Sequence, residues 1–313
     1  MARPLQYVPE SMQVFEVTVR CIQGRFLMRP GVERNRRMLG VIARSLEVCA
    51  GHVELYLVGC TSNHAHFIVG VEDAEWKARW KSHLLTNLSK ELGDLYDWPG
   101  AMFERRCRDI PILDDEALVE RLVYTMSQAV KEGLVRSPSA WPGIPWVEAV
   151  TQGVDLVGVW YDRTRWHRLR RGWSRGEKSQ RGKSPCLADV AVAKTVTLAV
   201  PPIWRDLDEV AVRAKWCELA EIALERYPAP SRVLGCVGVL AAHPHHRPMK
   251  SKHSPAPKVH TACRRLRAAW LEAYASFVAA YRAAMMRLKD GWLEVGFPPG
   301  GCRPACLLGD RGG

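Results

Sequence analysis

The sequence predicts an α+β protein: a four-stranded antiparallel sheet in residues 1–150, followed by a basic, mainly α-helical extension in residues 151–313. Apolar residues alternate with a period of two in short segments and recur every three or four residues in the segments between them. With 313 residues, 47% of them hydrophobic, the chain is long enough for two modest domains. The net charge of +12 resides in the second half: residues 1–150 carry 18 basic and 19 acidic side chains, and residues 151–313 carry 27 and 14.

The cysteines and the hydropathy pattern favour a cytoplasmic protein. Ten cysteines are scattered without a CxxC pair, which fits a reducing compartment. No stretch approaches the roughly 18 uncharged residues that a membrane span requires, and the first residues lack the apolar core of a signal peptide. We therefore expect a cytoplasmic, nucleoid-associated protein with no membrane partner, and the surplus of Lys and Arg favours a polyanion as its partner.

The chain is expected to open with a strand, a helix and a hairpin. Residues 14–21 (VFEVTVRC) alternate apolar and polar side chains, as a strand with one buried face does. Apolar residues then recur at helical spacing over 33–49. Two further β-rich runs, 52–58 and 66–71, are separated by a short loop that is consistent with a hairpin.

A second helix, a fourth strand and a third helix follow. Asp73 is suited to cap a helix over 75–95. Residues 107–113 form a short extended run that Pro111 confines to an edge of the sheet, and the third helix is expected over 114–135. This order is that of a ferredoxin-like, split βαβ arrangement, with helices on one face of the sheet and the other face free for a ligand.

Two histidines form a candidate metal site at the start of the third strand. His64 and His66 point the same way because strand side chains alternate, so both imidazoles can bind one ion. Alone, such a pair is more often a hydrogen-bonded structural feature than a pair of ligands. Tyr124 and Gln128 are one turn apart on the third helix, which could bring a phenol and an amide oxygen to the imidazoles. Two imidazoles and an amide oxygen suit Mg²⁺ or Mn²⁺ holding a phosphate.

Four segments of the first half follow one another in a recognisable order. They are SNHAHFIV (62–69), the stretch from FERR to ILDD (103–115), YTMSQAVKEGLV (124–135) and Trp141-Pro142. They resemble, in turn, the N-H-x-H-hydrophobic strand, the strand closed by Asp-Asp, the tyrosine helix and the Trp-containing turn of the HUH single-tyrosine transposases. The resemblance is strongest to the REP-associated tyrosine transposases, and it covers about the first 150 residues.

The resemblance implies an HUH endonuclease core and a mechanism. A divalent ion, Mg²⁺ or Mn²⁺, held by His64, His66 and Gln128 would polarise a phosphate of single-stranded DNA, and Tyr124 would attack the phosphorus. The products would be a 5′-phosphotyrosine link and a free 3′-OH, and the covalent link allows rejoining without ATP. The resemblance also implies hairpin-forming repeats as the DNA, and a homodimer is an open expectation.

Departures from the family pattern leave other functions open. Ser62 stands where Pro is usual, Ala65 where a bulky residue is usual, and Gln128-Ala129 where the family has Asn-Pro. The Gln carbonyl is chemically equivalent to that of Asn. One alternative is a domesticated, non-catalytic single-stranded nucleic-acid-binding protein. Another is a metal-dependent phosphoesterase in which Tyr124 is structural, and RNA also remains open as the ligand.

Most predicted DNA contacts lie in the second half. Residues 159–173 interleave aromatics with arginines, a pattern that suits single-stranded nucleic acid and equally an amphipathic helix with a tryptophan core. Residues 243–253 concentrate histidines and basic residues, which we interpret as a DNA-facing loop rather than a second metal site. A strand is expected over 195–200, and helices over 206–227 and 263–289. The candidate contacts are Arg105, Arg106, Arg163, Arg165, Trp166, Arg168, Arg170, Arg171, Arg247, Lys250 and Lys252.

Overall fold

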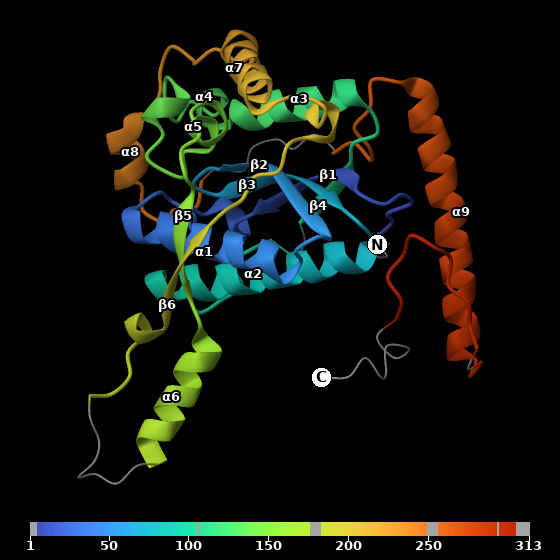
Figure 1. Cartoon of the computed structure of the whole chain (residues 1–313), viewed down its shortest axis with the longest axis horizontal. Coiled ribbons are helices and arrows are strands. Elements are labelled where there is room, and N and C mark those ends of the chain that lie inside the picture. Colours follow the sequence, from blue (N-terminus) through green and yellow to red (C-terminus); the bar gives the residue numbers. More distant parts are fainter. Residues whose placement is uncertain (1–4, 105–106, 176–182, 249–255, 293, 305–313) are drawn as a thin grey trace.

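The computed structural model describes residues 5–104, 107–175, 183–248, 256–292 and 294–304. A four-stranded sheet lies in the middle of the fold, with helices on both of its faces (Figure 1). Within the described ranges, every helix is too short or too polar to span a lipid bilayer.

The sheet is antiparallel throughout. Its strands are β1 (Gln13–Arg20), β2 (Val53–Cys60), β3 (His64–Val71) and β4 (Arg108–Pro111), in the order β2-β3-β1-β4. The predicted mixture of strands and helices, and their order along the first half, are confirmed. β4 is an outer strand of this sheet, as Pro111 predicted. Just beyond its end the backbone of His260 pairs with the chain, donating to Pro111 O at 2.8 Å and accepting from Leu113 N at 3.0 Å.

Helices cover the two faces of the sheet unequally (Figure 1). α1 (Val32–Val48) and α2 (Ala74–Tyr96) pack on one face, whereas α3 (Asp115–Met126), α4 (Gln128–Lys131) and α5 (Trp146–Thr151) lie over the other. The prediction that this second face is free for a ligand is therefore wrong. The physical reason lies in β3: one of its faces is entirely apolar, and the other carries Ile68 beside the two histidines, so both faces have apolar surface to bury.

Side-chain caps fix where the helices begin. Asp73 accepts a hydrogen bond from Trp76 N at 2.7 Å, as predicted, and Asp114 accepts one from Ala117 N at 2.8 Å. The third helix is shorter than predicted because Ser127 interrupts it and separates α3 from α4. The break falls between the two residues that the sequence predicts for the site, Tyr124 and Gln128.

The second half begins with a two-stranded ribbon that packs on α1. β5 (Val157–Tyr161) pairs with β6 (Ala191–Thr195), and Gly158 lies so close to α1 that a Cβ there would be 2.1 Å from Gly40 N. The strand predicted over 195–200 is thus displaced to Ala191–Thr195, because pairing with β5 ends at the Val157–Thr195 pair.

The rest of the second half is mainly helical, as predicted. α6 (Arg163–Arg175) projects from the body on the side of α1 and α2 (Figure 1). α7 (Glu209–Arg226) packs on α3 and α5, and α8 (Gly235–Ala241) and the long α9 (Arg264–Lys289) follow. Short 3₁₀ turns lie at Ile22–Gly24, Pro138–Ala140, Leu187–Val190 and Pro202–Trp204.

One hydrophobic core joins the two halves of the chain. Residues after 150 that belong to the same buried cluster as the sheet are Leu156, Val196, Trp204, Val212, Trp216, Leu219, Ala223 and Val239. The division into domains at residue 150 stays a prediction, and the packing across that boundary is continuous.

Candidate functional site

β3 presents His64 and His66 to the helices of the second face. In the sheet register, His64 is opposite Arg20 and His66 is opposite Thr18 on β1. The two rings are nearly perpendicular, with centroids 5.2 Å apart. His64 and His66 are 6% and 7% exposed, so both imidazoles are buried between the sheet and α3.

Oxygen atoms surround the His64 ring. Its Nδ1 lies 2.7 Å from Asn63 Oδ1 and 2.9 Å from Thr61 Oγ1, and its Nε2 lies 3.1 Å from Gln128 Oε1. Burial, and after it the neighbouring His66, lowers the pKa of His64 to about 3, although the contact with Gln128 opposes the shift. His64 is therefore a neutral imidazole at physiological pH.

A buried carboxylate holds the His66 ring. His66 Nδ1 lies 2.8 Å from Glu16 Oε1 and 3.3 Å from Thr18 Oγ1. The other carboxylate oxygen, Glu16 Oε2, lies 2.7 Å from His260 Nε2. Burial alone would raise the pKa of Glu16, but its contacts with His260 and His66 outweigh burial and hold the pKa far below its usual range. Glu16 is thus an ionised group that holds His66 and lies against His260.

The interrupted helix positions Tyr124 and Gln128. Gln128 Nε2 donates to Tyr124 O at 3.2 Å, which orients the amide so that its oxygen faces His64. Ser127 Oγ donates to the same carbonyl at 2.8 Å. Tyr124 is half-buried, and its ring centroid lies 5.7 Å from that of His66. The structure therefore brings together all four residues predicted for the metal site and the nucleophile.

Two cations lie against the Tyr124 ring. Lys131 Nζ is 4.0 Å and Arg121 Cζ is 4.7 Å from the ring centroid. Arg121 belongs to α3, as Tyr124 does, and Lys131 belongs to α4, beyond the interruption at Ser127. The site thus combines a phenol and two cations with the adjacent imidazoles.

Gly59 allows α3 to approach the sheet. It pairs with His66 across β2 and β3, and a Cβ on Gly59 would lie 2.9 Å from Thr125 Cγ2 and 3.1 Å from Thr125 O. A larger residue would force the helix away from the histidines. Gly59 therefore sets the distance between β3 and the helix that carries Tyr124.

Sequence reasoning missed Glu16, His260 and Gly59. Glu16 had a usable signal, because it is an acidic residue within a strand whose neighbours are apolar. His260 had none, because only the return of the chain to the sheet edge brings it to Glu16.

The predicted DNA contacts of α6 fall into two groups. Arg163 forms ion pairs with Glu91, at 2.7 Å, and with Asp94, at 2.6 Å, so its guanidinium is engaged within the protein. Trp166 is half-buried and donates to Pro185 O at 3.3 Å. The exposed members are Arg165, Arg168, Arg170 and Arg171.

The remaining predicted contacts are only partly described. Arg247 is exposed, in a segment whose Pro248 lies near Gly24, and the Gly24 carbonyl accepts from Asn63 Nδ2 at 3.1 Å. The basic segment thus approaches the neighbour of His64. Arg105, Arg106, Lys250 and Lys252 lie outside the described residues. Among the residues that are described, no group of three or more His, Cys, Asp or Glu is placed to hold a metal ion. The third ligand of the predicted site is instead the amide oxygen of Gln128.

A scan of the chain against protein-family models finds no match, and a search of the curated proteins finds none. One similar solved structure is described as a REP-associated tyrosine transposase bound to a REP hairpin. It is 16% identical with a TM-score of 0.37, and the match covers 46% of this chain and 81% of that chain. A similarity this low carries no weight for activity or ligand.

Proposed function

We propose that the protein is a metal-dependent HUH-type tyrosine transposase that cleaves and rejoins single-stranded DNA through a 5′-phosphotyrosine on Tyr124. The observation that carries the proposal is the convergence of Tyr124 and Gln128 with the two histidines of β3. Apolar side chains would suffice to pack this interface, so a cluster of polar, chemically competent groups needs another reason. The strand order β2-β3-β1-β4 supports a ferredoxin-like HUH core as the finer description of the fold.

The donor set fits Mg²⁺ or Mn²⁺. Each histidine has an oxygen partner at Nδ1, Asn63 for His64 and Glu16 for His66, which leaves Nε2 as the ligand atom. When Nδ1 carries the proton, His64 Nε2 and Gln128 Oε1 present two lone pairs 3.1 Å apart. Adjacent ligands of an octahedral ion with bonds of about 2.0–2.1 Å are separated by about 3 Å, so this spacing suits one ion. A bound ion would stabilise negative charge on the scissile phosphate.

The chemical step belongs to Tyr124. Its Oη attacks phosphorus and forms a Tyr–O–P bond, while the P–O3′ bond breaks and its electron pair stays on the 3′ oxygen. The phenol proton goes, directly or through water, to that oxygen, which leaves as a 3′-OH. Lys131 and Arg121, which lie against the ring, would bind the phosphate during the step. Because the link is a phosphodiester, attack by a 3′-OH reverses the reaction.

The exposed arginines of α6 would bind DNA away from the chemistry. α6 projects on the α1 and α2 side of the sheet, whereas α3 with Tyr124 lies on the opposite side (Figure 1). We propose that α6 holds the hairpin or flanking DNA through phosphate contacts while a single-stranded segment reaches Tyr124. One chain supplies Tyr124 and His66 side by side, so the step needs no homodimer.

A second candidate function is a non-catalytic single-stranded nucleic-acid-binding protein. It is favoured by the closure of the site, because α3 covers the histidines and Gln128 contacts His64 directly. Such a protein would bind DNA through α6 and would make no covalent link.

The test is a covalent adduct. The full-length protein is incubated with labelled single-stranded hairpin DNA from beside its own gene and Mn²⁺ or Mg²⁺, and the products are separated on a denaturing gel. We expect an adduct that is lost in Tyr124→Phe and His64→Ala. Tyr227→Phe is the matched control, because its ring lies 6.1 Å from that of Tyr124 and its loss should leave the adduct intact.

The other outcomes separate the alternatives. Cleavage without an adduct, retained in Tyr124→Phe, would identify a phosphoesterase. Binding without cleavage on several hairpins would favour the non-catalytic protein. An adduct lost in Tyr227→Phe and kept in Tyr124→Phe would show that the nucleophile is Tyr227 and that our assignment of Tyr124 is wrong.

A further inference from the structure

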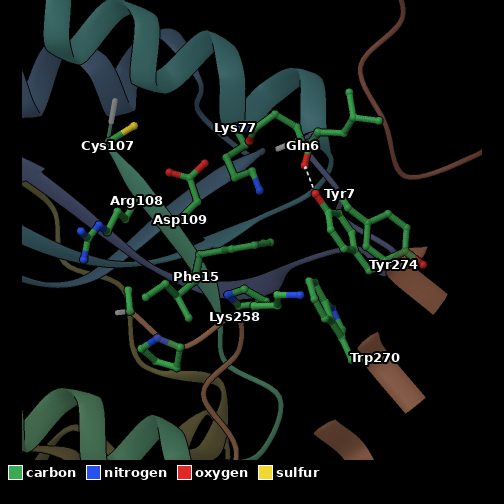
Figure 2. Close-up of a pocket in the computed structure, with 15 residues that line it drawn as sticks. Gln6, Tyr7, Phe15, Lys77, Cys107, Arg108, Asp109, Lys258, Trp270 and Tyr274 are labelled. Atoms are coloured by element: carbon green, nitrogen blue, oxygen red, sulfur yellow. Dashed lines mark hydrogen bonds between the residues drawn. The ribbon is translucent and has the colours of Figure 1, made fainter. Parts of the chain in front are cut away.

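A cavity of about 510 Å³ opens beside β4, between the segment Leu5–Tyr7, α2 and α9 (Figure 2). Its volume is in the range of small-molecule sites, about 300–1,000 Å³. None of Tyr124, His64, His66 and Gln128 lines it. Phe15, which does, points from β1 to the face opposite to that of its neighbour Glu16. The cavity is thus separate from the candidate catalytic site.

Aromatic rings form one wall of the cavity. Trp270 and Tyr274 from α9 are stacked, with centroids 5.0 Å apart and an angle of 12° between the rings. Tyr7 lies against both, at 6.0 Å from Trp270 and 5.8 Å from Tyr274. Phe15 lies across from them in Figure 2. Flat aromatic walls bind planar ligands, because stacking is favourable with any π-face.

Two buried polar atoms in the wall lack hydrogen-bond partners among the residues that the structure describes, and a buried lysine lies beside them. Lys77 is 2% exposed, and its Nζ lies 3.6 Å from the centre of the Phe15 ring without an assigned hydrogen bond. Asp109 Oδ1 and Trp270 Nε1 are buried and unpaired, although the Cys107 thiol, a weak donor, also faces the carboxylate. Figure 2 shows the Lys77 amine pointing into the space between Asp109 and Tyr7. Buried polar groups without partners are costly, and a ligand would satisfy them.

The charge of the cavity favours an anion. Arg108 and Lys258, and Lys77 when it is protonated, line it against one carboxylate, that of Asp109, which is already paired with Lys81 through Oδ2. Lys258 is exposed, and its amine points toward Trp270 (Figure 2). A phosphate beside Lys258 would thus lie next to the aromatic wall.

We propose that this cavity binds one nucleotide unit, with its base against Trp270 and Tyr274 and its phosphate at Lys258. The Watson–Crick edge of the base would accept from Lys77 and donate to Asp109 Oδ1, because on that edge every unpaired nucleobase offers an acceptor next to a donor. The unit can be a free nucleotide or the terminal nucleotide of a DNA strand, because the recognising chemistry is the same. The proposal does not depend on strand cleavage by Tyr124.

The ionisation of Lys77 agrees with its role as a donor to a base. Burial lowers its pKa to about 7; Lys81 adds to the shift, whereas Asp109, Cys302 and Cys107 oppose it. A base acceptor hydrogen-bonded to the ammonium would favour the protonated form, so binding near pH 8 takes up a proton. Calorimetry in two buffers of different ionisation enthalpy measures that proton directly.

The experiment measures binding of the four 5′-deoxynucleoside monophosphates and of short single strands with and without a 5′-phosphate to the full-length protein. We expect Lys77→Met and Trp270→Ala each to weaken binding at least tenfold. Lys90→Met is the matched control, because Lys90 is an exposed lysine on the same helix, outside the cavity.

The arms of the experiment separate the two sources of the nucleotide. Binding of the monophosphates that depends on Lys77 supports a free nucleotide, and Lys77-dependent binding of the strands alone supports a strand end. The proposal is overturned if neither ligand binds, or if Lys77→Met and Trp270→Ala bind as tightly as Lys90→Met. Proton uptake that persists in Lys77→Met would also overturn the role given to this lysine.

Discussion

Glu16 Oε2 lies 2.7 Å from His260 Nε2, and this contact ties the second half of the chain to the candidate site. The same carboxylate holds His66 through Oε1. His260 reaches it because its backbone pairs with Pro111 and Leu113 at the sheet edge. The extension is therefore part of the structure around the site as well as a carrier of positive charge.

Replacing Glu16 should weaken the metal site. Glu16→Gln removes the negative charge that orients His66, and loss of such an outer partner typically costs 10–100-fold in metal affinity. Titration of the protein with Mn²⁺ measures the change. Glu10→Gln, at an exposed acidic residue before the same strand, serves as the control. Equal Mn²⁺ affinity in the Glu16→Gln variant and the control would show that Glu16 does not support metal binding.

A methyl group at Gly59 should displace α3. The new Cβ would meet Thr125, and overpacking of this kind costs about 1–3 kcal/mol in the free energy of unfolding. Denaturant unfolding measures that loss, and we expect adduct formation to fall with it because Gln128 moves from His64. Gly172→Ala makes the same change on α6 with no atom within 4 Å, and it should leave stability unchanged or higher. A stable, fully active Gly59→Ala protein would contradict the close approach.

Lys77 should make stability depend on pH. Its pKa is about 7 in the folded protein against an ordinary value of 10.5, chiefly because of burial, so between these pH values only the unfolded chain keeps the proton. Stability then rises with pH, by up to about 1.4 kcal/mol per pH unit. Lys77→Met should be more stable than the wild type at pH 7, with the difference shrinking toward pH 10. Urea unfolding of both proteins at several pH values tests this. If the free energy of unfolding of Lys77→Met followed pH in the same way as that of the wild type, the prediction would be refuted.

Two arginines of α6 should behave differently. Arg163→Met breaks the ion pairs with Glu91 and Asp94, and we expect it to lower stability by about 1–3 kcal/mol without weakening DNA binding. Arg168→Met changes an exposed residue, and we expect weaker binding with a salt slope reduced by about 0.7–0.9, the loss of one phosphate contact to a single strand or to the hairpin stem. Unfolding and salt-dependent binding curves give both numbers for each variant. A salt slope unchanged in Arg168→Met would show that Arg168 makes no phosphate contact and would contradict DNA binding through this part of α6.

The local pattern was sufficient for most of the elements. The strands, the first two helices, the Asp73 cap and the edge position of Pro111 followed from side-chain period and from the chemistry of single residues. These features depend on neighbours in the chain, so the sequence contains their causes. The shifted strand at Ala191–Thr195 and the covered face of the sheet depended on partners distant in the chain, and the prediction for both was wrong.

Local patterns were enough to find the four residues of the candidate site, because alternation places His64 and His66 on one face of a strand and helical spacing places Tyr124 and Gln128 on one face of a helix. Packing between distant segments brings the two faces together, through the clearance at Gly59, and adds Glu16 and His260 to them. It also decided that Arg163 is engaged by acids of α2, and that a cavity forms around Lys77. Contacts between segments far apart in the chain depend on how whole surfaces pack, and a local period contains no information about its distant partner.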